Sequence, residues 1–252
     1  MKVSRPKDLG LPAIDLLEEA VHLLRTAPLG ALALYYAGTI PFVLAFLFFW
    51  SDMSRSALAE DRLAPLAGGL AVLFAVMKLC HAGFGRQLRE FMLGQPLPQL
   101  SWVQWLGIAS VQTFWQATGL IVMPVALTIL LPAGWCYAFY QNLSALGAVT
   151  TDPAANPVRE AARQARRWPR QNHLVLVIVS ALYPVVLINV AIVLYGIPFL
   201  LKTLLGIETG FTQGIWAIFN TTFLATAFAV AWLCVDPLLK ALYVLRDRKS
   251  VV

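Results

Sequence analysis

Six apolar runs, each near the length of a membrane-spanning helix, constrain what this chain can fold into. A bilayer core about 30 Å thick needs roughly 20 apolar residues in helical form. Lipid offers no hydrogen-bond partners, so each run must satisfy its own backbone groups as a helix. The runs are residues 29–50, 63–83, 105–131, 133–149, 174–201 and 211–235.

The composition agrees with this interpretation. Charged residues make up 13% of the 252 residues, whereas soluble domains carry about 25%. The first run begins at Leu29, too late and too long for a cleaved signal peptide. A short turn near Pro132 separates the third run from the shorter fourth, so these two must form a hairpin. We expect an all-α, polytopic membrane protein, with one domain over residues 1–252 and six transmembrane helices in three hairpins.

The lysines and arginines predict the orientation. If the N-terminus is cytoplasmic, 15 of the 19 basic residues fall on the cytoplasmic side, and Arg55, Arg62 and Lys202 fall on the other. Such a bias sets the orientation of membrane proteins. It also supports the short fourth run as a span, because without that span the arginine-rich segment at 158–173 would lie outside. We expect a bacterial inner-membrane protein with both termini in the cytoplasm.

Amphipathic segments precede the three hairpins on the cytoplasmic side, at residues 13–28, 86–102 and 158–173. Helices of this kind can lie in the membrane interface, with basic residues near anionic headgroups. In the first segment an apolar stripe recurs at helical spacing and predicts the buried face. That stripe consists of Ile14, Leu17, Val21 and Leu24.

The third segment carries signals for the start and end of a helix. Asn156 can cap it, Pro157 suits the first helical position, and Pro169 ends or bends it. An alanine-rich stripe runs beside the arginines, and we expect the arginines to bind anionic lipids or a protein partner. The candidate interface residues are Arg159, Arg163, Arg166, Arg167, Trp168 and Arg170.

The end of the chain predicts a similar helix. Asp236 can cap it, Pro237 can begin it, and Asp236 can pair with Lys240 one turn later. Lys78 is the only charge well inside an apolar run. It can extend toward the cytoplasmic face along its helix, or it can pair with another group, for which Asp236 is the candidate.

Amide side chains recur near the middle of the later runs. They can line a polar cavity for a lipid headgroup or small solute, or they can hold helices together by hydrogen bonds. Both interpretations remain open at this stage. The candidate cavity residues are Gln112, Gln116, Gln141, Asn142, Asn189 and Asn220.

No catalytic motif is present in the sequence. It has no phosphate-binding glycine loop with lysine, no His-Glu-x-x-His and no nucleophile elbow. The spacing of His22, His81 and His173 does not suggest shared metal ligation. The arginines lack interleaved stacking aromatics, which disfavours nucleic-acid binding. No acidic residue lies mid-run, which disfavours proton-coupled transport. We expect no enzymatic activity, no metal and no cofactor.

Five segments resemble uncharacterised bacterial integral membrane proteins. Such proteins tend to be encoded beside a MoxR-type ATPase, von Willebrand-factor-A-domain proteins and a transglutaminase-like membrane protein. The layout is also loosely similar to the membrane domain of some glycerophosphodiester phosphodiesterases, whose catalytic domain this sequence lacks. The segments are FYQN (139–142), ARRWPRQNH (165–173), LLKTLLGIET (200–209), FNTTF (219–223) and DPLLKALYVLR (236–246).

These observations lead to two functional hypotheses. The first is a non-enzymatic membrane subunit or scaffold of an envelope-associated complex, with protein partners in the membrane and anionic lipids at its cytoplasmic face. The alternative is a protein that binds or transports a lipid or small solute in an amide-lined cavity.

Overall fold

A computed structural model describes residues 12–129, 133–146, 156–208 and 220–251. Within these ranges the chain forms helices and no strand, as the sequence predicted. The helices are α1 (Ala13–Thr26), α2 (Leu29–Arg55), α3 (Ala59–Leu93), α4 (Trp102–Ile129), α5 (Ala133–Leu146), α6 (Pro157–Arg166), α7 (Pro169–Leu205) and α8 (Thr221–Val251).

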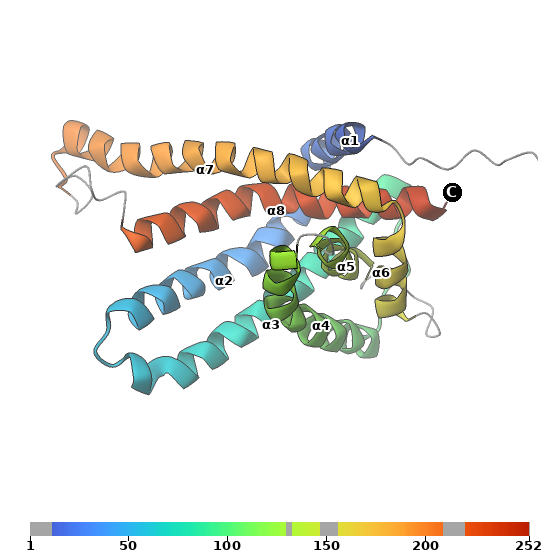
Figure 1. Cartoon of the computed structure of the whole chain (residues 1–252), viewed down its shortest axis with the longest axis horizontal. Helices are drawn as coiled ribbons and strands as arrows, with labels where there is room; N and C mark the ends of the chain where they lie inside the picture. The colour runs from blue at the N-terminus through green and yellow to red at the C-terminus, as the bar shows by residue number, and fades with distance from the viewer. Residues whose placement is uncertain (1–11, 130–132, 147–155, 209–219, 252) are drawn as a thin grey trace, which may run out of the picture.

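The helices α2, α3, α7 and α8 extend along the long axis of the molecule, and α4 and α5 are inclined to them (Figure 1). The connection from α2 to α3 lies at one end, together with the end of α7 and the start of α8. We call this the far end. The helices α1 and α6 and the last turns of α8 lie toward the opposite end, which we call the basic end.

Of the described helices, five are long and apolar enough to cross a membrane, namely α2, α3, α4, α7 and α8. These five support a multi-pass membrane protein. The predicted fourth span, residues 133–149, corresponds to α5, which has 14 residues. Residues 147–149 of the predicted span lie outside the described residues. At 1.5 Å per residue the described part, α5, is about 21 Å long, less than the bilayer core. The prediction of six full-length spans is therefore met only in part.

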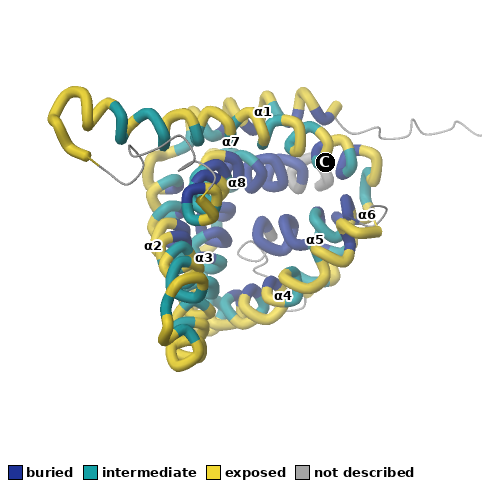
Figure 2. Tube along the Cα trace, turned by 60° about the vertical axis from the view of Figure 1, so that its left-hand side comes forward, coloured by how far each residue is buried: buried dark blue, intermediate teal, exposed yellow. Residues whose placement is uncertain are grey.

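The buried residues gather in the half of the molecule nearer the basic end (Figure 2). Tyr35 of α2, Phe84 of α3 and Leu242 of α8 are almost inaccessible there and belong to one apolar cluster. Toward the far end α3 and α7 expose most of their apolar side chains. Such faces suit contact with lipid, because acyl chains are as apolar as the side chains.

The buried face of α1 differs from the predicted one. Ala13, Leu16, Ala20 and Leu23 are buried, and α1 packs against α8. In the predicted stripe Leu17 and Leu24 are partly buried, whereas the two β-branched residues are exposed. Both stripes have helical spacing, and the alanines of the buried one allow the helices to approach closely.

The predicted interface segment at 86–102 is not a separate helix. Its first half continues α3 as far as Leu93, and Gly94 ends that helix with φ of +66°. Glycine adopts this left-handed conformation without steric cost, which makes it the common residue after a helix.

The prediction of a separate helix beginning at Pro237 is wrong. Pro237 lies inside the continuous helix α8. Proline has no backbone N–H, so the carbonyl of Leu233 loses its usual helical donor. The hydroxyl of Tyr36 on α2 donates to this oxygen at 3.4 Å. A neighbouring helix thus supplies the missing donor, which is how membrane helices tolerate internal proline.

Gly38 allows α2 and α3 to pack closely. A Cβ at this position would lie 2.6 Å from Cβ of Cys80 and 3.2 Å from Cα of Met77. We expect Gly38→Ala to destabilise the protein by about 1–3 kcal/mol, because the two backbones must separate. Thermal unfolding in detergent measures this. Gly30→Ala is the matched control, since a Cβ at Gly30 meets nothing within 4 Å. Equal melting temperatures for the two variants would contradict the prediction.

Candidate functional site

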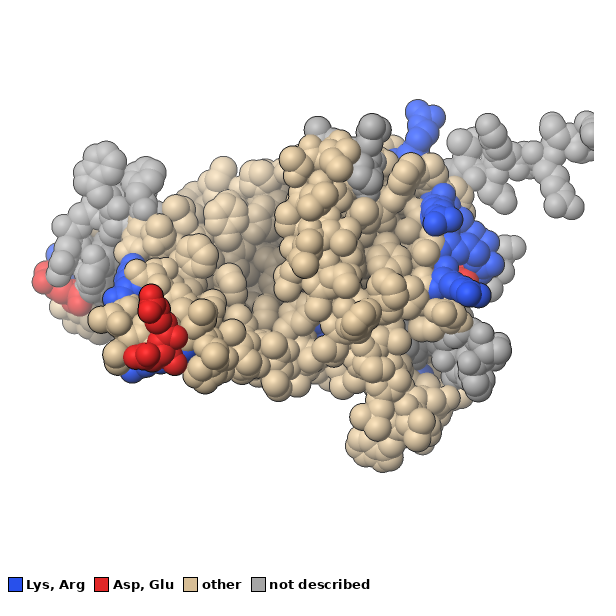
Figure 3. Space-filling model, turned by 60° about the horizontal axis from the view of Figure 1, so that its bottom comes forward, with Lys and Arg blue, Asp and Glu red and all other residues tan. Residues whose placement is uncertain are grey.

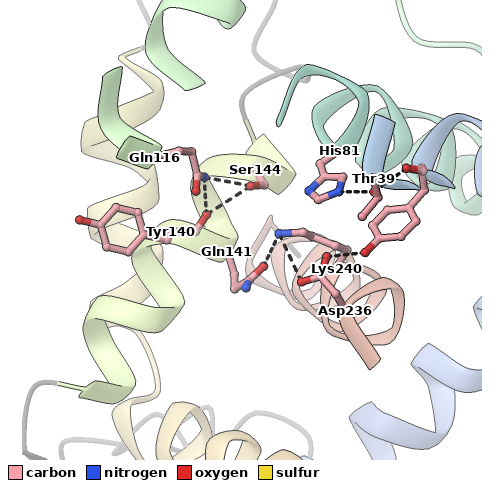
Figure 4. A network of polar contacts seen from close by, with 9 residues as sticks. Thr39, His81, Gln116, Tyr140, Gln141, Ser144, Asp236 and Lys240 are labelled. Atoms are coloured by element: carbon pink, nitrogen blue, oxygen red, sulfur yellow. Dashed lines mark hydrogen bonds and ion pairs between the residues drawn. The ribbon is translucent and has the colours of Figure 1, made fainter. Parts of the chain in front are cut away.

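A network of polar side chains lies in the buried half of the molecule (Figure 4). Asp236 and Lys240 of α8 form its centre, and their side chains are 4% and 5% exposed. Lys240 Nζ lies 3.9 Å from Asp236 Oδ1, which confirms the pairing predicted from their spacing. Ionised groups inside a membrane protein are costly and commonly functional. The pair therefore marks the candidate site.

Tyr35 of α2 holds the other oxygen of the carboxylate. Its hydroxyl donates to Asp236 Oδ2 at 2.7 Å. The ring of Tyr35 stacks on His81 of α3 with centroids 4.6 Å apart. Thr39 Oγ1 donates to the Tyr35 carbonyl at 2.6 Å and contacts His81 Nε2 at 2.9 Å. The contact between Thr39 and His81 joins α2 to α3 within the network.

Lys240 extends the network from α8 to α5. Its ammonium donates to Gln141 Oε1 at 2.8 Å. Beside these two residues lies a cavity of about 180 Å³, bordered by α3, α4, α5 and α8. Its polar lining residues are Lys78, Gln116, Tyr137, Tyr140, Gln141 and Lys240.

Two of the predicted amides join α4 to α5. Gln112 Nε2 donates to the carbonyl of Leu143 at 2.7 Å. Gln116 Nε2 donates to the carbonyl of Tyr140 at 2.9 Å and to Ser144 Oγ at 3.0 Å. These bonds connect the two helices. Of these two amides, Gln116 also borders the cavity and Gln112 does not.

The remaining predicted amides are divided between two regions. Asn142 is buried on α5, beside Gln141 in the chain. Asn189 is exposed on α7 and donates to the carbonyl of Val185 in its own helix at 2.7 Å. Asn220 precedes the first turn of α8 and accepts a hydrogen bond from Arg55 at the far end, at 2.8 Å. The structure therefore does not bring Asn189 and Asn220 together with the other four.

The predicted pair of Lys78 and Asp236 is not formed. Within the described residues the ion-pair partner of Asp236 is Lys240. Lys78 Nζ lies 5.1 Å from the ring centroid of Phe74, one turn earlier on α3, and borders the cavity. Sequence reasoning missed Tyr35, and only the packing of α2 against α8 reveals its role.

The arginine-rich segment forms α6 as predicted. Asn156 Oδ1 accepts from the backbone N–H groups of Val158 and Arg159 at 3.0 and 3.2 Å, and Pro157 is the first helical residue. Ala161 and Ala165 are buried, and α6 packs against α5. The alanine stripe thus contacts protein.

A buried arginine of α8 holds the other end of α6. Arg246 donates to the carbonyls of Gln164 and Arg167 at 3.0 and 2.6 Å, and to Asn172 Oδ1. Its guanidinium also lies 5.8 Å from the ring centroid of Trp168. Arg246 therefore adds donors at the C-terminal end of the helix, where carbonyls lack the usual intrahelical partners. The Gln164 carbonyl also accepts from the Arg167 N–H at 3.2 Å. The sequence offered no signal for this role, because the partners lie about 80 residues earlier.

The arginines of α6 face outward. Arg159, Arg163 and Arg166 are exposed, as is Arg170 at the start of α7. Figure 3 shows a group of basic side chains at this end of the molecule. Arg167 and Trp168 are partly buried at the turn into α7.

Glu160 is the acidic member of this face, and its carboxylate lies 2.7 Å from Arg163. Burial opposes the ionisation of Glu160, but hydrogen bonds from Arg163 and Gln164 outweigh it and lower the pKa of the carboxyl. The face nevertheless keeps an excess of positive charge.

In the described part of the chain, no three His, Cys, Asp or Glu side chains are placed to hold a metal ion. Comparisons of the chain with protein-family models, with curated proteins and with solved structures found no match.

Proposed function

We propose that this chain is a non-enzymatic subunit of a membrane complex, and that it presents the arginine face of α6 to an acidic protein partner. The fixed position of α6 carries the proposal. A topology signal needs only positive charge near a span. Here the helix is capped by Asn156, packed on α5 and held by the buried Arg246. Such anchoring reduces the entropy lost on binding.

The geometry favours a protein partner over the bilayer surface. A helix that lies in the membrane interface needs an apolar face for the acyl boundary. The alanine face of α6 is already used, since Ala161 and Ala165 are buried. What remains exposed is a row of guanidinium groups, of which that of Arg163 is paired with Glu160. Guanidinium binds carboxylates with two parallel hydrogen bonds. An acidic segment of another protein fits this chemistry.

We infer that the basic end faces the cytoplasm of a bacterium and that the chain resides in the inner membrane. The support is the excess of lysine and arginine at that end. The resemblance of residues 135–246 to proteins encoded beside a MoxR-type ATPase is the reason to expect a multi-protein complex. Six complete spans in three hairpins remain part of the proposal.

The alternative function, binding of a lipid or small solute, is favoured by one observation. A cavity of about 180 Å³ borders Gln116 and Gln141. Gln112 and Gln116, however, donate to groups on α5 and so join two helices. Of the predicted amides, only Gln116 and Gln141 are among the described residues that line the cavity.

Copurification in mild detergent tests the proposed function. We expect the combined variant Arg159→Gln, Arg163→Gln and Arg166→Gln to lose at least tenfold of the copurifying partner, because three exposed charges are removed while the cap and the alanine face remain. Quantitative mass spectrometry after affinity purification measures this. Arg62→Gln with Lys202→Gln is the control, since both are exposed far from α6. Unchanged partner yields, or a wild-type protein that purifies alone, would contradict the proposal.

A further inference from the structure

Two lysine side chains border the cavity between the helices, and no carboxylate of a described residue does. Lys78 comes from α3 and Lys240 from α8, and the lining that the structure describes contains no Asp or Glu. Asp236 balances the charge of Lys240 and also accepts from Tyr35. Lys78 has no ion pair with any described residue. A cation of this kind is costly in an apolar interior unless a counter-charge is present.

The other polar groups of the lining suit an anion. Tyr137, Tyr140, Gln116 and Gln141 also border the cavity. Phenol and amide groups can donate hydrogen bonds to oxygen, and donors from ammonium groups form the stronger, charge-assisted kind. The lining therefore combines positive charge with neutral donors.

The volume limits the ligand to a small group. A water molecule occupies about 30 Å³, so about 180 Å³ corresponds to roughly six water molecules, which is enough for a compact ion together with a few waters. Cavities for drug-sized ligands span roughly 300–1,000 Å³. Along their helices Lys78 and Lys240 lie about 12 and 9 Å from Arg86 and Arg246, counted at 1.5 Å per residue. The cavity thus lies below the level of the arginines at the basic end.

We propose that this cavity binds a small oxyanion, with phosphate as the representative, held between Lys78 and Lys240. Free phosphate and the phosphate of a lipid headgroup share this chemistry. The proposal is separate from the docking face of α6. It rests on the alternative function, the binding of a lipid or small solute. It assigns to that function a chemical class of ligand and two lysines that the predicted amides did not indicate.

Binding of inorganic phosphate to the full-length protein in mild detergent is the first measurement. We expect saturable binding to the wild type and at least tenfold weaker binding to Lys78→Gln. Lys78 is the residue to change because Lys240 balances Asp236 and its loss could disturb the fold. Lys202→Gln is the matched control, since that lysine is exposed and forms a surface ion pair with Glu208. Circular dichroism and gel filtration verify that the variants are folded.

Native mass spectrometry from nanodiscs of phosphatidylglycerol or phosphatidylcholine is the second measurement. A phospholipid retained by the wild type from phosphatidylglycerol alone, and lost in Lys78→Gln, supports the headgroup as the source even if free phosphate does not bind. Met123→Trp is a second variant, which fills the cavity and keeps both lysines. It should abolish binding from either source.

Three results would overturn the proposal. The first is an affinity for phosphate and for anionic lipid that is unchanged in both Lys78→Gln and Met123→Trp. The second is no binding by the wild type in either measurement. The third is a neutral ligand that Met123→Trp displaces and Lys78→Gln does not, which would leave ligand binding in the cavity intact and reject only the anion.

Discussion

Arg246→Met is expected to destabilise the protein by about 3 kcal/mol or more and to release α6 from the body of the molecule. The guanidinium is buried and donates to the carbonyls of Gln164 and Arg167 and to Asn172 Oδ1. Methionine has a similar length but no donor, so the Arg167 carbonyl and Asn172 Oδ1 would lose the donor that Arg246 supplies, whereas the Gln164 carbonyl keeps its bond from the Arg167 N–H at 3.2 Å. Each buried acceptor without a donor costs about 1–3 kcal/mol.

Thermal unfolding in detergent and hydrogen exchange over residues 157–167 measure the two effects. Arg159→Met is the control, because Arg159 is exposed on α6. Substitutions at exposed positions usually change stability by less than about 0.5 kcal/mol. Arg246→Lys should be intermediate, since one ammonium cannot reproduce the fork of the guanidinium. An Arg246→Met protein that melts like the control would show that the alanine face of α6 and the bond from Asn172 Nδ2 to the Ala165 carbonyl at 2.7 Å hold this helix without Arg246.

The start of α6 could be predicted from the sequence and the role of Arg246 could not, for a physical reason. A helix cap depends only on residues within one turn, so Asn156 and Pro157 predict the start of α6 from the local sequence. Arg246 acts across about 80 residues, and its sequence neighbours reveal nothing about Gln164 or Asn172. The same holds for Tyr35, whose partner Asp236 lies 201 positions later.

The positions of lysine and arginine predicted at which end of the molecule each connection lies. They did not predict how many helices cross the bilayer completely. The bias of lysine and arginine reports only the end at which each connection lies. Because α4 and α5 together return the chain to the basic end (Figure 1), the bias is the same whether or not each of them crosses the whole bilayer. The length of the fourth span is the relevant measure, and its described part, α5, has 14 residues, fewer than a full crossing requires.

Depth within a run was an unreliable guide to the polar site. Counting from the ends of residues 211–235 placed Asn220 near the middle, whereas α8 begins at Thr221 and Asn220 lies at its start. On α1 two apolar stripes have equal periodicity, and only the packing against α8 selects the one with alanines. Periodicity identified the helices, but the faces and depths depend on contacts between helices.

Asp236→Asn is expected to have an effect as large as that of Arg246→Met. Asparagine has nearly the same shape and can still accept from Tyr35, so little packing is lost. Lys240, however, would keep its charge in a site where its side chain is 5% exposed. Removing one partner of a buried ion pair typically costs about 3–5 kcal/mol, because an uncompensated charge remains.

A double-mutant cycle separates this electrostatic effect from lost contacts. The combination of Asp236→Asn with Lys240→Met removes both charges and should be more stable than Asp236→Asn alone, since a buried pair can be replaced by apolar groups at little cost. The matched control is Glu208→Gln, which breaks the exposed pair with Lys202 and should change stability by less than about 1 kcal/mol. If the double variant unfolds at the same temperature as Asp236→Asn or below it, the charge of Lys240 is not the source of the instability. The instability of Asp236→Asn would then come from the weaker bond that a neutral amide oxygen accepts from Tyr35, and α2 rather than α5 would be the helix that depends on Asp236.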